Sequence, residues 1–258
     1  MAFLQVQFFS KALDVASTVN VILPEPSQGI GVDAAQAAEP PKVLYLLHGY
    51  SDDHSIWMRR TSVERYAAQY NLAVVMPAVN HSFYTNEVQG ERYWDYVSEE
   101  LPQVMHRFFR LSRRPEDTFV AGLSMGGYGA MKLALTHPER FGAAASFSGA
   151  VDIVALSRNT PSKANMQRVF GPLSKLKGSE HDLFHLMESR PEKAPRLYVS
   201  CGTADFLYGA HRKFVPALKK HGWDVTSFEK PDAVHEWGFW DEEIKKFIPF
   251  AMGNTVLK

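Results

Sequence analysis

A glycine-flanked serine is the first feature of the sequence that could do chemistry. Ser124 lies in the pattern Gly-x-Ser-x-Gly, with Gly122 two residues before it and Gly126 two residues after it. An apolar run over 119–123 precedes the serine, and helix-forming residues over 128–135 follow it. A serine at a tight strand-to-helix turn projects its hydroxyl from the sheet edge, and the flanking glycines let the backbone pass because they lack a Cβ. The pattern therefore predicts a nucleophilic serine.

The alternative interpretation is a glycine-rich loop that only packs a helix against a strand. The strand–turn–helix context around Ser124 favours the nucleophile over this alternative. No Gly-x-Gly-x-x-Gly motif opens the chain, and no Gly-Lys-Ser/Thr follows a glycine loop, which argues against nucleotide binding.

A serine nucleophile needs a base and an acid that orients the base, and two later loops offer them. Asp205 follows an apolar run at 196–201, and His235 follows a second run at 225–228. Reacting groups gather at the carboxyl ends of strands in an open α/β sheet. The order Ser124, Asp205, His235 is that of the α/β hydrolases, and it predicts His235 as the proton carrier and Asp205 as its partner.

Each of these two residues also has a plainer interpretation. Asp205 could be a turn residue or a helix N-cap, and His235 could be a loop histidine beside a helix start. Asp152 and Asp232 are competitors for the acid. We prefer Asp205, because Gly202 gives it a turn at the end of a strand.

Acyl transfer also requires donors for the oxyanion. The N–H after the nucleophile, that of Met125, is one expected donor. The second is expected from the loop after the apolar strand 43–47, and the N–H of Tyr50 is our choice. We expect His48 to support this loop rather than to carry protons. The Tyr50 and Trp237 side chains are expected to line the substrate pocket.

Other reactive residue types are assigned structural roles. His181 and His185 stand four residues apart, but no third ligand accompanies them, so we interpret them as surface or lid residues. Cys201, the single cysteine, lies within a predicted strand and is expected to be a small core residue. We expect no metal and no cofactor.

The elements that position these residues alternate between strands and helices, which predicts a mostly parallel sheet covered by helices on both faces. Two alternating segments, within 4–8 and 18–23, are expected to be antiparallel edge strands. The proline- and glycine-containing stretch 24–41 is expected to be a long surface loop. The remaining predicted elements are strands at 43–47, 72–76, 118–123, 141–147, 196–201 and 225–228, and helices at 62–70, 95–110, 128–135, 208–221 and 236–250.

Composition narrows the class of protein. The 258 residues are expected to form one domain over 1–258, with a lid-like insertion at 151–195 after the sixth strand. Lysine plus arginine (28) equals aspartate plus glutamate (28), which disfavours nucleic acid or an acidic membrane as a partner. The first ten residues do not resemble a signal peptide, and no apolar run approaches bilayer length, so we expect a cytoplasmic protein.

Along nearly its whole length the chain resembles the esterase D branch of the α/β hydrolases. This branch includes S-formylglutathione hydrolases, and the similarity is greatest to the bacterial tributyrin and cinnamoyl or feruloyl esterases. The resemblance implies an α/β-hydrolase fold, a triad of Ser124, Asp205 and His235, carboxylic ester substrates and a homodimer or homotetramer. It is carried by Tyr-Leu-Leu-His-Gly at 45–49, Asn-Leu-Ala-Val-Val-Met-Pro at 71–77, Gly-Leu-Ser-Met-Gly-Gly-Tyr-Gly at 122–129, Ser-Phe-Ser-Gly at 146–149 and His-Glu-Trp at 235–237.

The sequence thus predicts a serine carboxylesterase that cleaves short-acyl esters of small molecules. S-formylglutathione hydrolase and feruloyl or acetyl-xylan esterase are the enzyme alternatives. A non-catalytic binding module on a hydrolase fold is the alternative from another class, and it is disfavoured because serine, acid and base candidates are all present.

Overall fold

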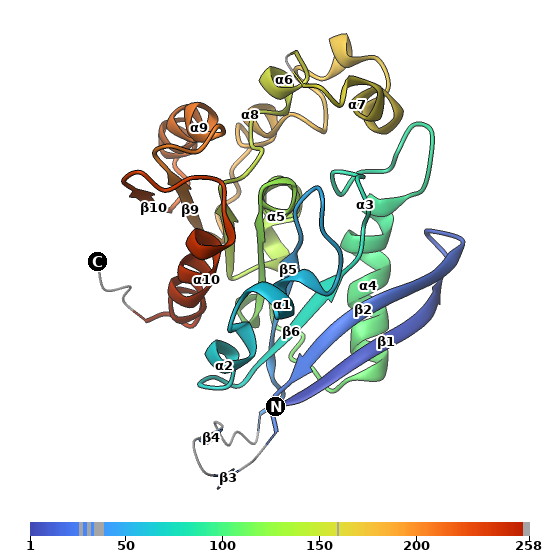
Figure 1. The fold of residues 1–258 in the computed structure, drawn as a ribbon, viewed down its shortest axis with the longest axis vertical. Coiled ribbons are helices and arrows are strands. Elements are labelled where there is room, and N and C mark those ends of the chain that lie inside the picture. Colours follow the sequence, from blue (N-terminus) through green and yellow to red (C-terminus); the bar gives the residue numbers. More distant parts are fainter. Residues whose placement is uncertain (26–27, 30–31, 34–38, 159, 255–258) are drawn as a thin grey trace.

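The computed structural model describes residues 1–25, 28–29, 32–33, 39–158 and 160–254 (Figure 1). Its centre is an eight-stranded sheet in the order β1-β2-β6-β5-β7-β8-β9-β10. β1 pairs antiparallel with β2 and β2 antiparallel with β6, whereas the other neighbours in this sheet pair parallel. The strands are β1 (Ala2–Ser10), β2 (Val15–Leu23), β5 (Lys42–Leu47), β6 (Leu72–Pro77), β7 (Thr118–Leu123), β8 (Ala143–Phe147), β9 (Arg196–Gly202) and β10 (Val225–Lys230).

This topology confirms the predicted mostly parallel sheet with two antiparallel N-terminal strands. The strands from β6 to β8 read as unbroken apolar runs because both of their faces are buried. β1 alternates instead, with Leu4, Val6 and Phe8 facing the protein and Phe3 and Phe9 facing solvent. Such alternation is expected for an antiparallel strand that has one solvent-exposed face.

Helices cover both faces of the sheet and enclose two hydrophobic cores. One core packs α1, α2 and α10 against the sheet, and the other packs α4, α5 and α9 against its opposite face. The helices are α1 (Ile56–Arg60), α2 (Val63–Ala67), α3 (Tyr93–Asp95), α4 (Leu101–Phe108), α5 (Met125–Thr136), α6 (Ile153–Leu156), α7 (Lys163–Phe170), α8 (Leu183–Leu186), α9 (Tyr208–Lys220) and α10 (Trp237–Ala251). None of the helices in the described part of the chain combines the length and apolar character needed to cross a bilayer.

The helix predicted over 95–110 differs from expectation. Helical structure begins at Tyr93, ends at Phe108 and contains a π-helical segment at Tyr96–Glu100. Pro102 explains the irregularity, because it has no N–H to donate to the Ser98 carbonyl four residues earlier. That carbonyl instead accepts a hydrogen bond from Arg140 at 2.9 Å. The sequence analysis also missed the short helix α1.

Two further segments bear on the predictions. The segment 151–195 carries α6, α7 and α8, which lie in Figure 1 beyond the ends of the parallel strands, on the side of α3 and the loop before α9. Within the predicted loop 24–41, two short strands pair antiparallel, β3 (Gln28–Gly29) and β4 (Val32–Asp33). Residues 26–27, 30–31 and 34–38 of that loop lie outside the described residues.

Candidate active site

Ser124 occupies a strained turn between β7 and α5. Its backbone angles, φ 53° and ψ −117°, lie in a region that a residue with a Cβ rarely adopts. A Cβ on Gly122 would stand 2.4 Å from the carbonyl carbon of Gly126, and a Cβ on Gly126 would stand 2.4 Å from the Leu47 carbonyl oxygen. Both distances are far inside van der Waals contact, so the turn requires glycine at both positions. The predicted strand–turn–helix elbow is therefore present.

His235 and Asp205 form a hydrogen-bonded pair at the ends of β9 and β10. The Nδ1 atom of His235 lies 2.8 Å from Oδ2 of Asp205, while Oδ1 of Asp205 accepts from the Leu207 N–H at 2.8 Å. The Asp205 side chain is fully buried, and the His235 side chain is 20% exposed. Burial alone would raise the pKa of Asp205, but the hydrogen bonds from His235 and Leu207 outweigh it and lower the pKa.

An ionised Asp205 sets the chemistry of the imidazole. Because the carboxylate can only accept, the His235 Nδ1 carries the hydrogen of this bond. The other nitrogen, Nε2, is then available to accept a proton. This is the arrangement that a general base beside a nucleophilic serine needs.

Ser124 and His235 line the same cavity, whose volume is about 490 Å³. Its walls also include Asp52, Glu236 and Trp237. A second cavity of about 180 Å³ adjoins Ser124 on the side of the insertion, and its lining is mostly apolar. This smaller cavity is lined by Tyr50, Phe83, Met125, Ala150, Leu156, Thr160, Ser162, Met166, Phe206 and Leu207 together with Ser124.

Two backbone N–H groups are available beside the serine. Among the described residues, neither the Tyr50 N–H nor the Met125 N–H has a hydrogen-bond acceptor, and both residues line the 180 Å³ cavity. Both predicted oxyanion donors are thus positioned next to Ser124. The Tyr50 ring stacks on His81 with centroids 4.3 Å apart, which holds the side chain at the wall of the cavity.

His48 supports the loop that carries Tyr50. It is 1% exposed, its Nδ1 lies 2.7 Å from the Gly49 carbonyl oxygen, and its Nε2 accepts from the Val79 N–H at 3.0 Å. Burial lowers the pKa of His48 to about 4, so the ring is neutral near pH 7. This environment agrees with the predicted supporting role.

The remaining candidates do not line either cavity beside Ser124. Asp152 caps α6, where its Oδ1 accepts from the Ala155 N–H at 2.9 Å. Asp232 lies in an exposed turn with φ 58°. Cys201 is buried in β9, as predicted. No group of three or more potential metal ligands occurs within the described residues.

Of the two predicted roles for His181, surface residue or lid residue, the surface role is wrong, although the residue does lie in the insertion 151–195. Its side chain is only 15% exposed, and its Nδ1 lies 3.4 Å from Nζ of Lys132 on α5. His185 is exposed, as predicted, with its ring 3.5 Å from Glu188. The two histidines differ because the Tyr128 hydroxyl, on the same helix as Lys132, donates to the His181 carbonyl at 2.9 Å and draws that residue inward.

Sequence reasoning missed two residues of the site. Phe206 is 73% exposed, lines both cavities, and its ring centroid lies 4.6 Å from that of His235. Its only signal in the sequence is its position directly after Asp205. Asp52 lines the larger cavity, and burial raises its pKa. Its signal was its place in the loop that carries Tyr50.

Comparison with known proteins identifies the family. A family described as "Putative esterase" matches residues 10–250. The chain belongs to this esterase family. It is 33% identical to an acetyl esterase of Caldicellulosiruptor saccharolyticus, over 95% of this chain and 96% of the relative. The protein is therefore an ester-hydrolysing enzyme.

Solved structures of esterase family relatives have the same fold. The fluorophosphonate-binding serine hydrolase F of Staphylococcus aureus is 34% identical, with a TM-score of 0.87 over 97% of this chain and 98% of that one. An S-formylglutathione hydrolase of Staphylococcus aureus is 35% identical, with a TM-score of 0.85 over the same shares of the two chains. The α/β-hydrolase fold predicted from the sequence is thereby confirmed.

Proposed function

We propose that this protein is a serine carboxylesterase that hydrolyses short-acyl esters through an acyl-enzyme intermediate. The main support for the proposal is the hydrogen bond between His235 and Asp205, because His235 lines the same cavity as Ser124. A nucleophile on a glycine elbow and a base oriented by a buried carboxylate are the parts that acyl transfer requires.

In the first half of the reaction, the Ser124 hydroxyl attacks the carbonyl carbon of the ester while its proton passes to Nε2 of His235. The Tyr50 and Met125 N–H groups donate to the oxyanion of the tetrahedral intermediate. The intermediate collapses when the bond to the alcohol oxygen breaks. His235 gives its proton to that oxygen, and the acyl group remains on Ser124.

In the second half, water replaces the alcohol. His235 takes a proton from the water, whose oxygen attacks the acyl carbon and forms a second oxyanion in the same place. The bond to Ser124 then breaks, the serine oxygen recovers its proton from His235, and the carboxylic acid leaves. Asp205 stays ionised throughout and stabilises the imidazolium that forms in each half.

The acyl group fits the 180 Å³ cavity. This cavity is lined by Ser124 and Met125 and also by Met166 of α7, which is 1% exposed. Its volume is below the range of roughly 300–1,000 Å³ that is typical of sites for larger ligands. A short acyl chain is therefore the expected substrate, and the similarity to an acetyl esterase supports this choice.

A second candidate function is hydrolysis of S-formylglutathione, which the 35% identity to such a hydrolase favours. The larger cavity would then hold the leaving group. Two acidic side chains, Asp52 and Glu236, line this cavity. Carboxylates at this place disfavour a leaving group with net negative charge, such as glutathione, and they accommodate a neutral or hydroxyl-bearing alcohol.

A substrate panel tests the proposal and separates the two candidates. kcat/KM is measured for esters with acyl chains from acetyl to dodecanoyl, together with methyl ferulate and S-formylglutathione. We expect the highest value among the short acyl esters. A value for S-formylglutathione far above all the others would overturn the carboxylesterase assignment in favour of the thioester hydrolase.

Replacement of Ser124 tests the nucleophile. We expect Ser124→Ala to lower kcat by roughly 10⁴- to 10⁶-fold with an unchanged thermal unfolding midpoint. A fluorophosphonate probe should label the wild-type protein on the peptide that contains Ser124 and should not label the variant. Turnover by Ser124→Ala with a trapped acyl-enzyme would show that another residue is the nucleophile.

A further inference from the structure

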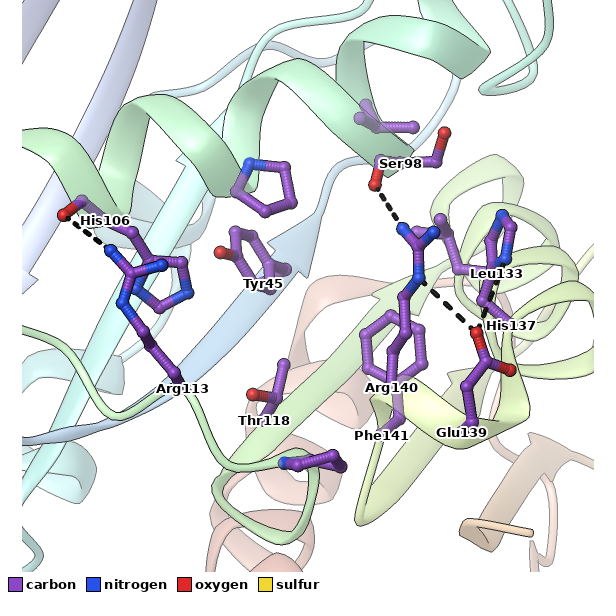
Figure 2. A pocket seen from close by; sticks show the side chains of 13 residues that line it. Tyr45, Ser98, His106, Arg113, Thr118, Leu133, His137, Glu139, Arg140 and Phe141 are labelled. Atoms are coloured by element: carbon purple, nitrogen blue, oxygen red, sulfur yellow. Dashed lines mark hydrogen bonds and ion pairs between the residues drawn. The ribbon is translucent and has the colours of Figure 1, made fainter. Parts of the chain in front are cut away.

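A separate cavity of about 210 Å³ is shown in Figure 2. It lies at the opposite ends of the elements that hold Ser124. It is lined by Thr118, the first residue of β7, and by Leu133 in the last part of α5. At about 3.3 Å per residue, the six steps from Thr118 to Ser124 along β7 span about 20 Å. The cavity shares no lining residue with the two cavities beside Ser124.

Two polar atoms of residues in this cavity are buried without a hydrogen-bond partner. They are the hydroxyl oxygen of Tyr45, a residue that is 5% exposed, and Nδ1 of His106. In Figure 2 the Tyr45 hydroxyl is directed towards the side of the cavity where His106 and Arg113 lie. Native structures rarely leave such groups unpaired, so a water molecule or a ligand in the cavity is the expected partner of each.

The charges around the cavity leave one cation uncompensated. Arg140 pairs with Glu99 at 2.8 Å and with Glu139 at 3.5 Å. Arg113, in contrast, is exposed and has no ion-pair partner among the described residues, and its guanidinium makes one hydrogen bond there, to the His106 carbonyl at 3.4 Å. A planar guanidinium with free N–H groups suits a carboxylate, which it can bind through two parallel hydrogen bonds.

The protonation states of the neighbours agree with an anionic ligand. Burial raises the pKa of Tyr45, so its hydroxyl keeps its proton and can donate. Burial and the charge of Arg113 lower the pKa of His106, so an empty cavity holds a neutral ring beside Arg113. The lining also includes apolar side chains, among them Pro102, Leu133 and Phe141, and the Arg140–Glu139 ion pair.

We propose that this cavity binds a small organic carboxylic acid. The carboxylate would contact Arg113 and the Tyr45 hydroxyl, with His106 beside it, and the apolar body would pack against Pro102, Leu133 and Phe141. A single cation without an ion-pair partner, the nearby Glu139 carboxylate and the apolar part of the lining favour a singly charged, partly apolar anion over phosphate. The proposed esterase reaction releases acids of this class, but binding at this cavity does not depend on that reaction.

Calorimetric titration of the full chain with sodium benzoate and sodium butyrate tests the proposal. Before titration, Ser124 is blocked with a fluorophosphonate, so that binding beside the active serine is excluded. We expect one saturable site with a dissociation constant of about 1 mM or tighter. If the fluorophosphonate does not react, the proposal that Ser124 is the nucleophile fails. The carboxylic-acid site is then tested by titrating unblocked protein and comparing the dissociation constants of the variants below.

Three variants locate the binding. Arg113→Gln and Tyr45→Phe should each weaken binding roughly tenfold or more, because each removes a hydrogen bond to a charged group. Arg107→Gln, which replaces an exposed arginine of α4 outside the cavity, should leave binding unchanged. Tyr45→Phe keeps the ring that packs in the core, so its fold is expected to be preserved.

Three outcomes would overturn the proposal. The first is no saturable binding of either acid. The second is binding that Arg113→Gln and Tyr45→Phe leave unchanged, which would place the acid elsewhere. The third is inorganic phosphate binding as tightly as benzoate with the same dependence on Arg113, which would show a general anion site.

Discussion

The Nδ1 atom of His235 lies 2.8 Å from Oδ2 of Asp205, across 30 residues of sequence. β9 and β10 are adjacent parallel strands, and both loops leave the sheet at the same end. Gly202 is the last residue of β9, and a Cβ there would stand 2.1 Å from the Ala233 carbonyl oxygen. The close passage of the two loops at Gly202 therefore brings Asp205 and His235 into contact.

This contact predicts that Asp205→Asn lowers kcat by about 10⁴-fold with little change in KM. An asparagine amide can donate to Nδ1 and so favours the imidazole tautomer that cannot accept the serine proton. Asp232→Asn is the matched control, because Asp232 lies in the same pair of loops but is exposed and outside both cavities. Steady-state kinetics measure kcat and KM for both variants. Equal activities would show that Asp205 does not orient the histidine.

The elbow glycines predict a contrast between two Gly→Ala substitutions. Gly126→Ala should lower both stability and activity strongly, because the new methyl group would stand 2.4 Å from the Leu47 carbonyl oxygen. Gly209→Ala in α9 should raise the free energy of unfolding by about 0.5–1 kcal/mol, because alanine loses less backbone entropy than glycine when a helix forms. The new methyl group is tolerated, since nothing lies within 4 Å of it. Urea unfolding and esterase assays measure both effects. A stable and fully active Gly126→Ala protein would contradict the close packing of the elbow.

The apolar cavity beside Ser124 predicts how acyl-chain preference changes with its end wall. Met166→Ala removes a buried side chain of α7 and should move the optimum acyl chain to longer lengths. It should also cost about 2–5 kcal/mol of stability if the space stays empty. Lys163→Ala, on the exposed side of the same helix, should change neither quantity. An unchanged chain-length profile in Met166→Ala would show that the acyl group binds elsewhere.

Lys132 is a buried cation in α5 and makes stability depend on pH. Its Nζ donates to Thr85 Oγ1 at 2.8 Å and lies 4.5 Å from the centre of the Trp94 ring. Burial lowers the pKa of Lys132 to about 7, against a smaller opposing effect of Glu180. A lysine in the unfolded chain has a pKa of about 10.4, so between pH 7 and pH 10 the unfolded state binds more protons than the folded state does. The free energy of unfolding therefore rises with pH across that window, and this contribution is lowest below pH 7.

We expect Lys132→Met to raise the free energy of unfolding at pH 6, by at most about 5 kcal/mol, because the pKa difference of roughly 3.5 corresponds to that amount. The gain should shrink towards pH 10, where the lysine is neutral in the folded protein. Urea unfolding at pH 6, 8 and 10 measures it, with the exposed Lys219→Met as the control. A pH dependence identical in wild type and Lys132→Met would show that the amine is not desolvated.

The nucleophilic elbow could be predicted from the sequence because its requirements are local. Gly122, Ser124 and Gly126 span a single turn, and the steric reason for Gly122 lies within that turn, whereas Gly126 also has to clear the Leu47 carbonyl of β5. The order of strands and helices could also be predicted from the sequence, since buried parallel strands appear in it as unbroken apolar runs. The ends of the helices were predicted less accurately, as the segment before α4 shows. The irregular helix there leaves the Ser98 carbonyl to accept a hydrogen bond from the Arg140 side chain, which is distant in sequence.

Only the tertiary structure decided which carboxylate contacts the histidine. Asp152 and Asp205 both follow strands, but Asp152 turns back to cap α6 and Asp205 turns towards β10. The burial of Lys132 could not be read from the sequence either, because a lysine in a helix is normally exposed and its surroundings come from other segments. Sequence thus determined the glycine-flanked turn at Ser124 and the layers of the fold through short-range sterics and apolar patterning. Long-range packing determined which carboxylate pairs with His235, the shape of the apolar cavity beside Ser124 and the charges around it, because these depend on side chains that meet only after the loops have closed.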